Sequence, residues 1–238
     1  NTSTMRLGYF DPSSGDNEGT LVDINVASGS SNPVIVWMEC IEPANIILIC
    51  LENNTRQPKW AYIAAGGTTP VYLGLRSNAS QNKDKWRFCW NYEEETSKYR
   101  FAMLVGDATE TYWIESTNPA SLPNGPTSYS GTQYDQDMQI MMSDTHLMFT
   151  KSANIYAKAF AGNVWRSSTA WTSYSNAFGS GSNPKAMNYN SVDGYNYTIT
   201  VNGQIFRFTA PTTSPDCIGT TGFGIATNGD TRIKFRGN

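Results

Sequence analysis

Several features that mark common functional classes are absent from this sequence. Charged residues make up only 16% of the 238-residue chain, and Lys and Arg form no run. Average globular domains contain about 25% charged residues. Proteins that bind the phosphate backbone of nucleic acids need clustered basic side chains, whereas the net charge here is −3. We therefore expect no direct contact with nucleic acid.

Long apolar stretches and catalytic motifs are absent as well. No stretch approaches the ~18 apolar residues that cross a bilayer, and the run from Ile46 to Leu51 has the length of a strand. Phosphate-binding loops and the G-x-S-x-G elbow are missing. The single histidine, His146, lies in an apolar strand-like run, and we interpret it as a packed or surface residue. The sequence predicts a non-enzymatic protein without a membrane span.

Metal-binding patterns are equally scarce. The four cysteines, Cys40, Cys50, Cys89 and Cys217, form no C-x-x-C pair, and histidine-based zinc or iron sites need more ligands than one histidine. We expect neither a metal nor a cofactor. Zero, one or two disulfides remain open.

Paired carboxylates keep one enzymatic alternative open. Glycoside hydrolysis needs only two carboxyl groups across a cleft. Asp135 with Asp137, and Glu110 with Glu115, are such pairs, although the E-x-D-x-E signature of jelly-roll glucanases is absent. A glycoside hydrolase is therefore the third functional hypothesis.

What is present is period-two patterning, interrupted every dozen residues or so by Gly, Pro, Asn or Ser. This pattern is typical of all-β proteins. We predict an antiparallel β-sandwich, jelly-roll-like and with long loops, in a single domain of residues 1–238. No repeat of fixed period is visible, which argues against a propeller or a solenoid.

Individual strands carry more specific predictions. The segments Pro33–Ile41 and Asn45–Glu52 are apolar on both faces, which indicates strands covered on both sides. A short link between them sets Cys40 opposite a residue near Ile46 or Leu48, which disfavours a Cys40–Cys50 bridge. In Lys85–Tyr92 every second residue is aromatic, so one face is expected in the core and the other in water. The following acidic tip, Glu93–Glu95, should be solvated.

The C-terminal third predicts two hairpins. A two-residue turn at Asn202–Gly203 would pair Ile199 with Phe206. A three-residue loop, Asn228–Asp230, would pair Ile225 with Ile233. Residues 162–195 are expected to form a long loop rich in aromatic residues, Ser and Asn, and loops of this length are often functional.

The aromatic residues of this loop are the candidate ligand or interface contacts: Trp165, Trp171, Tyr174 and Phe178. Flat rings beside hydroxyl and amide groups suit sugar stacking or a protein interface. The alternative is that the rings cap the core. Asn53, Asn78 and Asn196 lie in N-glycosylation sequons and are the candidate glycosylation sites.

Two functional hypotheses follow. The first is a structural or display protein, most concretely a virion coat or surface protein that assembles with copies of itself or with sibling subunits. The chain begins Asn1-Thr2-Ser3 without an initiator Met, which favours release from a precursor. The alternative is a secreted or cell-surface lectin or adhesin that binds host glycans or a receptor. Both place the protein in a virion or at the extracellular surface.

Overall fold

The computed structural model describes a protein built from β-strands. The described residues are 4–8, 21–25, 34–52, 58–64, 66–75, 86–105, 110–119, 127–130, 139–159, 171–222, 224, 233 and 235. Among them the only helical element in the element order is the single 3₁₀ turn η1 (Glu42–Ala44). No helix in this part of the chain has the length and hydropathy to span a bilayer.

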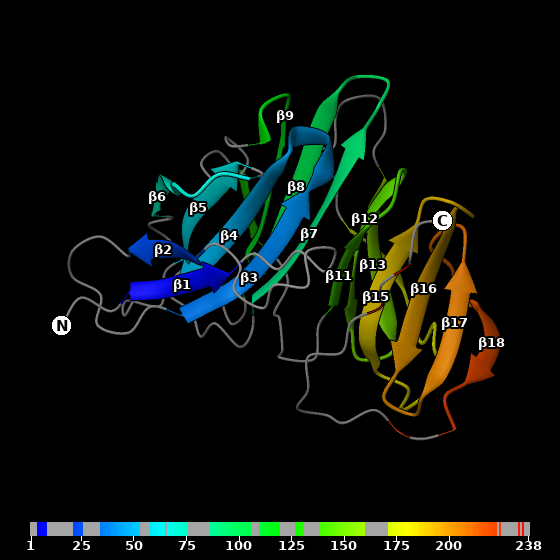
Figure 1. Cartoon of the computed structure of the whole chain (residues 1–238). Helices are drawn as coiled ribbons and strands as arrows, with labels where there is room; N and C mark the ends of the chain where they lie inside the picture. Colours follow the sequence, from blue (N-terminus) through cyan, green and yellow to red (C-terminus); the bar gives the residue numbers. More distant parts are fainter. Residues whose placement is uncertain are drawn as a thin grey trace.

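The strands form one hairpin and four larger sheets (Figure 1). The hairpin pairs β1 (Thr4–Gly8) with β2 (Leu21–Asn25). Sheet I contains β3 (Val34–Ile41), β4 (Ile46–Glu52), β5 (Pro58–Ala64) and β6 (Val71–Leu75). Sheet II contains β7 (Trp86–Glu93), β8 (Lys98–Val105), β9 (Glu110–Ser116) and β10 (Thr127–Ser130). Sheet III contains β11 (Gln139–Met142), β12 (His146–Lys151), β13 (Asn154–Ala159) and β14 (Thr172–Tyr174). Sheet IV contains β15 (Pro184–Asn190), β16 (Tyr195–Thr200), β17 (Gln204–Phe208) and β18 (Asp216–Thr220).

The all-β prediction is confirmed, whereas the sandwich or jelly-roll arrangement is not. Each sheet is an antiparallel meander of four strands in chain order, and none of the four closes. A jelly roll would instead place non-consecutive strands side by side. The first strand of each sheet, β3, β7, β11 or β15, begins at residue 34, 86, 139 or 184. The topology therefore repeats, although the sequence shows no repeat of fixed period.

The sheets pack face to face in chain order, and each interface has its own core. Between sheets I and II the buried side chains are mainly aromatic, with Trp37 and Trp60 from one sheet against Phe101 from the other. Between sheets II and III, Leu104 meets Ile140 and Phe149. The third core joins Met148 and Ile155 of sheet III to Phe206 and Phe208 of sheet IV.

Strand β8 shows how one sheet serves two interfaces. Phe101 and Met103 point into the first core, whereas Ala102 and Leu104 belong to the second. This follows directly from the two-residue period of a strand, because successive side chains point to opposite faces. Sheets II and III therefore need apolar residues on both faces, and the sequence supplies them.

The prediction of coverage on both faces is confirmed for β4. Leu48 and Cys50 on one face and Ile49 and Leu51 on the other are all fully buried. In β3 it holds only in part, because Cys40 is exposed and Met38 is 41% exposed. Cys40 pairs with Ile47 and is not bonded to Cys50, and all four cysteines are free.

The expected solvated face of β7 is wrong. Phe88 and Trp90 pack on the first core as predicted, but Cys89 packs against the second core. Burial raises the pKa of the Cys89 thiol well above its usual range. The alternation predicts one solvent-exposed face of β7 because the sequence gives no sign that sheet III lies behind this strand.

The register of the β16–β17 hairpin differs from the prediction by one residue. Ile199 pairs with Ile205 and Thr198 with Phe206. The loop has three residues because Gly203 takes a left-handed conformation (φ 73°) and donates its N–H to the Thr200 carbonyl at 2.9 Å. A glycine in that position is the standard partner of a three-residue hairpin loop. The hairpin predicted around Asn228–Asp230 lies outside the described residues.

The long loop predicted for residues 162–195 is also wrong in its second half. This range contains β14 and all of β15, and β15 is the first strand of sheet IV. Residues 162–170 lie outside the described part of the chain. Polar residues in β15, such as Asn188 and Asn190, hid its alternation.

Candidate functional site

Three of the four aromatic residues predicted to bind a ligand lie in the described part of the chain, and each of the three packs against a core. Phe178 is only 3% exposed and packs edge-on against Phe206, with ring centroids 5.4 Å apart. Trp171 packs edge-on against Phe149 at 4.7 Å, and Tyr174 packs against the third core. Trp165 lies outside the described residues. The alternative reading, that these rings cap the core, is the one that the described geometry supports.

Of the predicted glycosylation sites, only Asn196 lies in the described part of the chain; Asn53 and Asn78 do not. Asn196 is fully buried in β16, and its Nδ2 donates to the carbonyls of Phe208 at 3.0 Å and Thr209 at 3.2 Å. A glycan would replace one of the two hydrogens on this atom, so at most one N–H would remain for the two carbonyls, and the sugar would have to fit at a fully buried side chain. The structure therefore argues against Asn196 as a modified residue.

The carboxylate pairs cannot be placed against each other. Asp135 and Asp137 lie outside the described residues, and so do the side chains of Glu110 and Glu115 in β9. In the part of the chain with described side chains, no group of three or more His, Cys, Asp or Glu residues is arranged to hold a metal ion.

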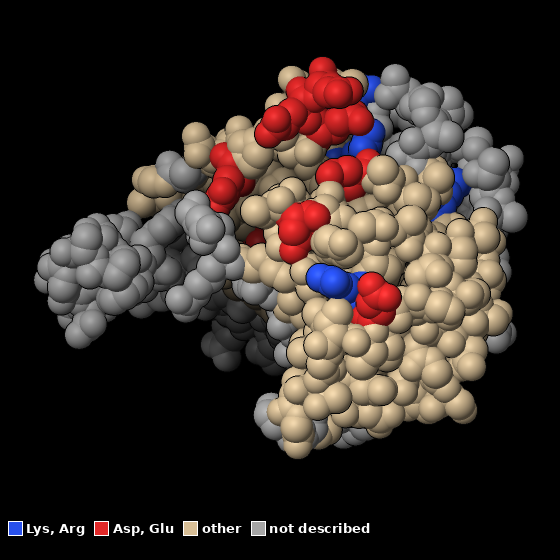
Figure 2. Space-filling view, turned by 90° about the vertical axis from the view of Figure 1, so that its right-hand side faces the viewer, with Lys and Arg blue, Asp and Glu red and all other residues tan. Residues whose placement is uncertain are grey.

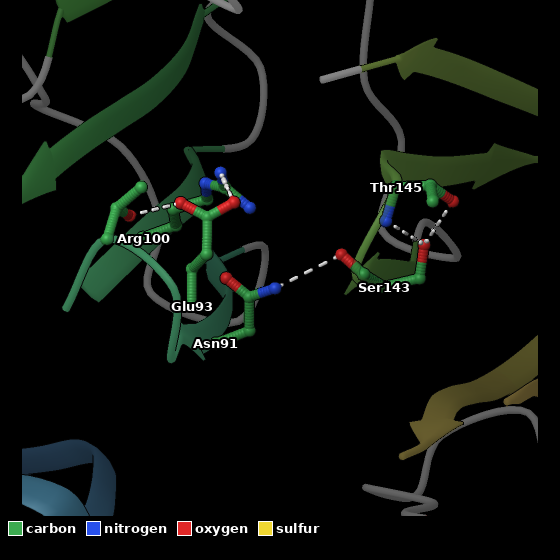
Figure 3. A network of polar contacts seen from close by, with 6 residues as sticks. Asn91, Glu93, Arg100, Ser143 and Thr145 are labelled. Atoms are coloured by element: carbon green, nitrogen blue, oxygen red, sulfur yellow. Dashed lines mark hydrogen bonds and ion pairs between the residues drawn. The ribbon is translucent and has the colours of Figure 1, made fainter. Parts of the chain in front are cut away.

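Polar side chains gather instead where the β7–β8 hairpin faces the β11–β12 turn (Figure 3). Ser143 organises the β11–β12 turn, because its Oγ accepts the N–H of His146 at 3.0 Å. Asn91 reaches across from β7 and donates its Nδ2 to the Ser143 carbonyl at 3.1 Å. The Oδ1 atom of Asn91 is buried there without a hydrogen-bond partner. This cluster, centred on Asn91 and Ser143, is named the turn cluster below.

An ion pair between Arg100 and Glu93 lies at the edge of the turn cluster. The Arg100 guanidinium is 4% exposed and lies 2.7 Å from the Glu93 carboxylate. Thr96 also donates its hydroxyl to Glu93. The pair pins the predicted β7–β8 hairpin at its tip, where Glu94 and Glu95 are exposed as expected. A charge this deeply buried is stable only when it is paired.

Two tyrosine–aspartate pairs extend the turn cluster toward sheet IV. Tyr189 donates its hydroxyl to Asp144, and burial together with this hydrogen bond raises the pKa of Tyr189 to about 12. Tyr197 donates to Asp193 at 2.7 Å, and this bond lowers the pKa of the Asp193 carboxyl. The Nδ1 atom of His146 is hydrogen-bonded to the Thr145 hydroxyl at 2.9 Å. Desolvation lowers the pKa of His146.

Acidic side chains gather at one end of the molecule, while much of the side that holds β18 carries few charges (Figure 2). Glu94, Glu95, Asp144 and Asp193 in the described turns are all exposed. Hydroxyls, amides and carboxylates at such turns can accept and donate hydrogen bonds to a polar ligand.

A second notable feature is the outer face of sheet IV, the face that points away from sheet III. Two residues far along the chain, Ile233 and Phe235, lie against it. Asn188 in β15 donates its Nδ2 to the Ile233 carbonyl at 2.8 Å. The Phe235 ring lies 5.0 Å from the ring of Tyr197 in β16. Both residues therefore contact the face of sheet IV that is opposite sheet III.

Comparisons with known proteins give no family. No family model matches the chain, and no curated protein matches it. Solved structures align weakly. The mitotic checkpoint complex aligns at TM-score 0.47 and 7% identity, over 79% of this chain and 55% of that one. A luciferin-regenerating enzyme aligns at TM-score 0.44 and 9% identity, over 84% and 64%.

The SREBP-SCAP binding domains of fission yeast align at TM-score 0.40 and 10% identity, over 82% of this chain and 56% of that one. The chain thus spans less than two thirds of each of these three chains. None of the three alignments reaches a TM-score of 0.5, so they support no conclusion about function.

Sequence reasoning missed both the turn cluster and the outer face of sheet IV. The turn cluster joins Asn91 to Ser143, which are 52 positions apart. Neither residue belongs to a motif, so only the stacking of sheets II and III brings them together. One sequence feature could have indicated the turn cluster: an aspartate, Asp144 or Asp193, lies in the turn after β11 and in the turn after β15.

Proposed function

We propose that this chain is a non-enzymatic structural protein that works by associating with copies of itself, as a virion coat or surface protein does. The observation that carries the proposal is the stacking of sheets through both faces. Each interface between neighbouring sheets buries apolar side chains from both sheets, and a stack of such layers has two ends. Apolar sheet faces at the ends of a stack are stabilised when another layer covers them.

The strand edges favour contact through the ends of the stack over contact through the sides. The edge strands β6 and β18 carry exposed apolar residues, Val71, Tyr72 and Ile218. However, the register shifts between Trp60 and Ala61 opposite β6, and between Ile205 and Phe206 opposite β18. Such irregularities bend an edge and discourage a neighbouring strand from adding to it.

Native size tests the proposal. We expect light scattering and negative-stain microscopy of the wild-type chain to find closed particles or filaments that grow with protein concentration. The variant Ile218→Lys should assemble like the wild type, because the β18 edge is not the contact. A chain that stays a monomer at every concentration would contradict the proposal.

The turn cluster supports a second candidate, a glycan-binding surface protein. The Asn91 amide, which binds the Ser143 carbonyl of the β11–β12 turn, and the Tyr189 ring beside Asp144 combine polar groups with a flat apolar face. Sugars are recognised by that combination. A glycan array should then show binding that Asn91→Ala and Tyr189→Ala abolish and Val192→Ala keeps. Val192 is 80% exposed in the turn after β15 and serves as the control.

A further inference from the structure

The positions of Ile233 and Phe235 in the chain match the spacing of the four sheets. First strands start at residues 34, 86, 139 and 184, at intervals of 45 to 53 residues. The same interval counted from residue 184 reaches residues 229 to 237, which include Ile233 and Phe235. These two residues also lie where a further first strand would lie, because they contact β15 and β16 as β11 contacts β7 and β15 contacts β11.

The hairpin β1–β2 is the complementary feature. In the described part of the chain it is hydrogen-bonded to no other strand, so it stands as a sheet of two strands. Isolated two-stranded hairpins are at best marginally stable in water. The hairpin β1–β2 precedes sheet I in the chain, whereas Ile233 and Phe235 follow sheet IV. The two features therefore belong to opposite ends of the stack.

One chain does not bring these two features together. In Figure 1 the hairpin lies at the left, beside sheet I, whereas β16, which Phe235 contacts through Tyr197, lies at the right. Their separation in this view already shows that they are apart in space. A second copy is therefore the occupant that the geometry favours.

We propose that the hairpin β1–β2 of one copy packs on the outer face of sheet IV of the next copy, beside Ile233 and Phe235. The inference rests on the proposed self-association and names the surfaces that meet. The contact joins two different surfaces, so it repeats head to tail and produces rings or filaments. A closed ring then engages every hairpin and every outer face, whereas a filament leaves one hairpin and one outer face unengaged at its two ends.

Two variants that block opposite ends test this contact. Phe235→Asp places a charge at the aromatic contact with Tyr197. Val22→Pro removes a backbone N–H from the middle of β2, whose register partner is Leu7. Each variant alone should remain a single chain in light scattering. An equimolar mixture should give a species of about twice that mass, because one intact hairpin and one intact face remain.

Controls separate the two levels of the proposal. Val192→Asp, a charge on an exposed turn, should assemble like the wild type. Circular dichroism identifies a variant that fails to fold, and Phe235→Ala then replaces Phe235→Asp. If the wild type assembles and both blocked variants assemble equally well, or the mixture yields no two-chain species, the hairpin contact is overturned while self-association stands. A monomeric wild type overturns both.

Discussion

The first and third interfaces between sheets have the same geometry but different chemistry. Between sheets I and II, Phe101 lies among three other rings, with centroids 5.2 Å from Trp60, 6.0 Å from Trp37 and 6.5 Å from Phe88. On sheet IV the strand β16 instead turns three polar side chains inward, Asn196, Thr198 and Thr200, each fully buried.

This difference means that the buried residues of the two interfaces contribute unequally to stability. Aromatic pairs add about 0.5–1.5 kcal/mol each beyond the area that they bury. Buried polar atoms stabilise only when they are paired, and Asn196 Oδ1, Thr198 Oγ1 and Thr200 Oγ1 have no partner. Stability should therefore be concentrated at the interface between sheets I and II.

The largest expected effect breaks the aromatic interface. Phe101→Ala should lower the free energy of unfolding by about 3–5 kcal/mol, because a fully buried ring leaves a cavity among three neighbours. Phe206→Ala should cost less, since the Phe178 ring is its one close ring partner among the described residues. Urea denaturation of both variants measures the difference. Equal losses would mean that the two interfaces are equally strong.

The second prediction addresses the polar row. Asn196→Ala should cost about 1–3 kcal/mol, because it leaves the carbonyls of Phe208 and Thr209 without their donor. The same denaturation experiment measures it. A loss below 0.5 kcal/mol, the range of surface substitutions, would show that water replaces the amide there.

Thr198→Val supplies the matched contrast. It exchanges an unpartnered hydroxyl for a methyl group of similar size, so the stability should change by less than about 1 kcal/mol and can rise. A loss as large as that of Asn196→Ala would mean that the hydroxyl is hydrogen-bonded to a buried water molecule.

Much of the strand content could be predicted from the sequence, but the order of the layers could not. The alternation in β7 and β8 predicted their hairpin, because each contributes aromatic residues to one core. The same rule failed for the second face of β7, since Cys89 and Asn91 look polar enough for water. Whether a moderately polar face meets water or another sheet depends on partners more than 50 residues away.

The candidate site was harder still. Trp171 and Phe178 have the composition of a binding loop, and only the positions of β12 and β17 show that they fill cores. The turn cluster had no detectable motif, because its hydrogen bonds join backbone and side-chain atoms of separate sheets. A single left-handed glycine, Gly203, moved the β16–β17 register by one residue and thereby turned Thr198 inward.

The smallest expected effect tests the polar link between sheets III and IV at alkaline pH. The folded state raises the pKa of Tyr189 to about 12, whereas an unfolded tyrosine titrates near 10. The protonated phenol is therefore favoured by folding. Its contribution to stability is complete below about pH 10 and is lost as the pH rises through about 12.

Tyr189→Phe should lose less stability than the wild type between these pH values, measured by urea denaturation at pH 8, 10 and 11. Tyr156→Phe, whose ring stacks on Phe149 away from Asp144, is the control. Equal losses of stability in all three proteins would show that the Tyr189–Asp144 bond does not couple the two sheets. Tyr189→Phe should still lose some stability at alkaline pH, because the pKa of Tyr197 is also raised.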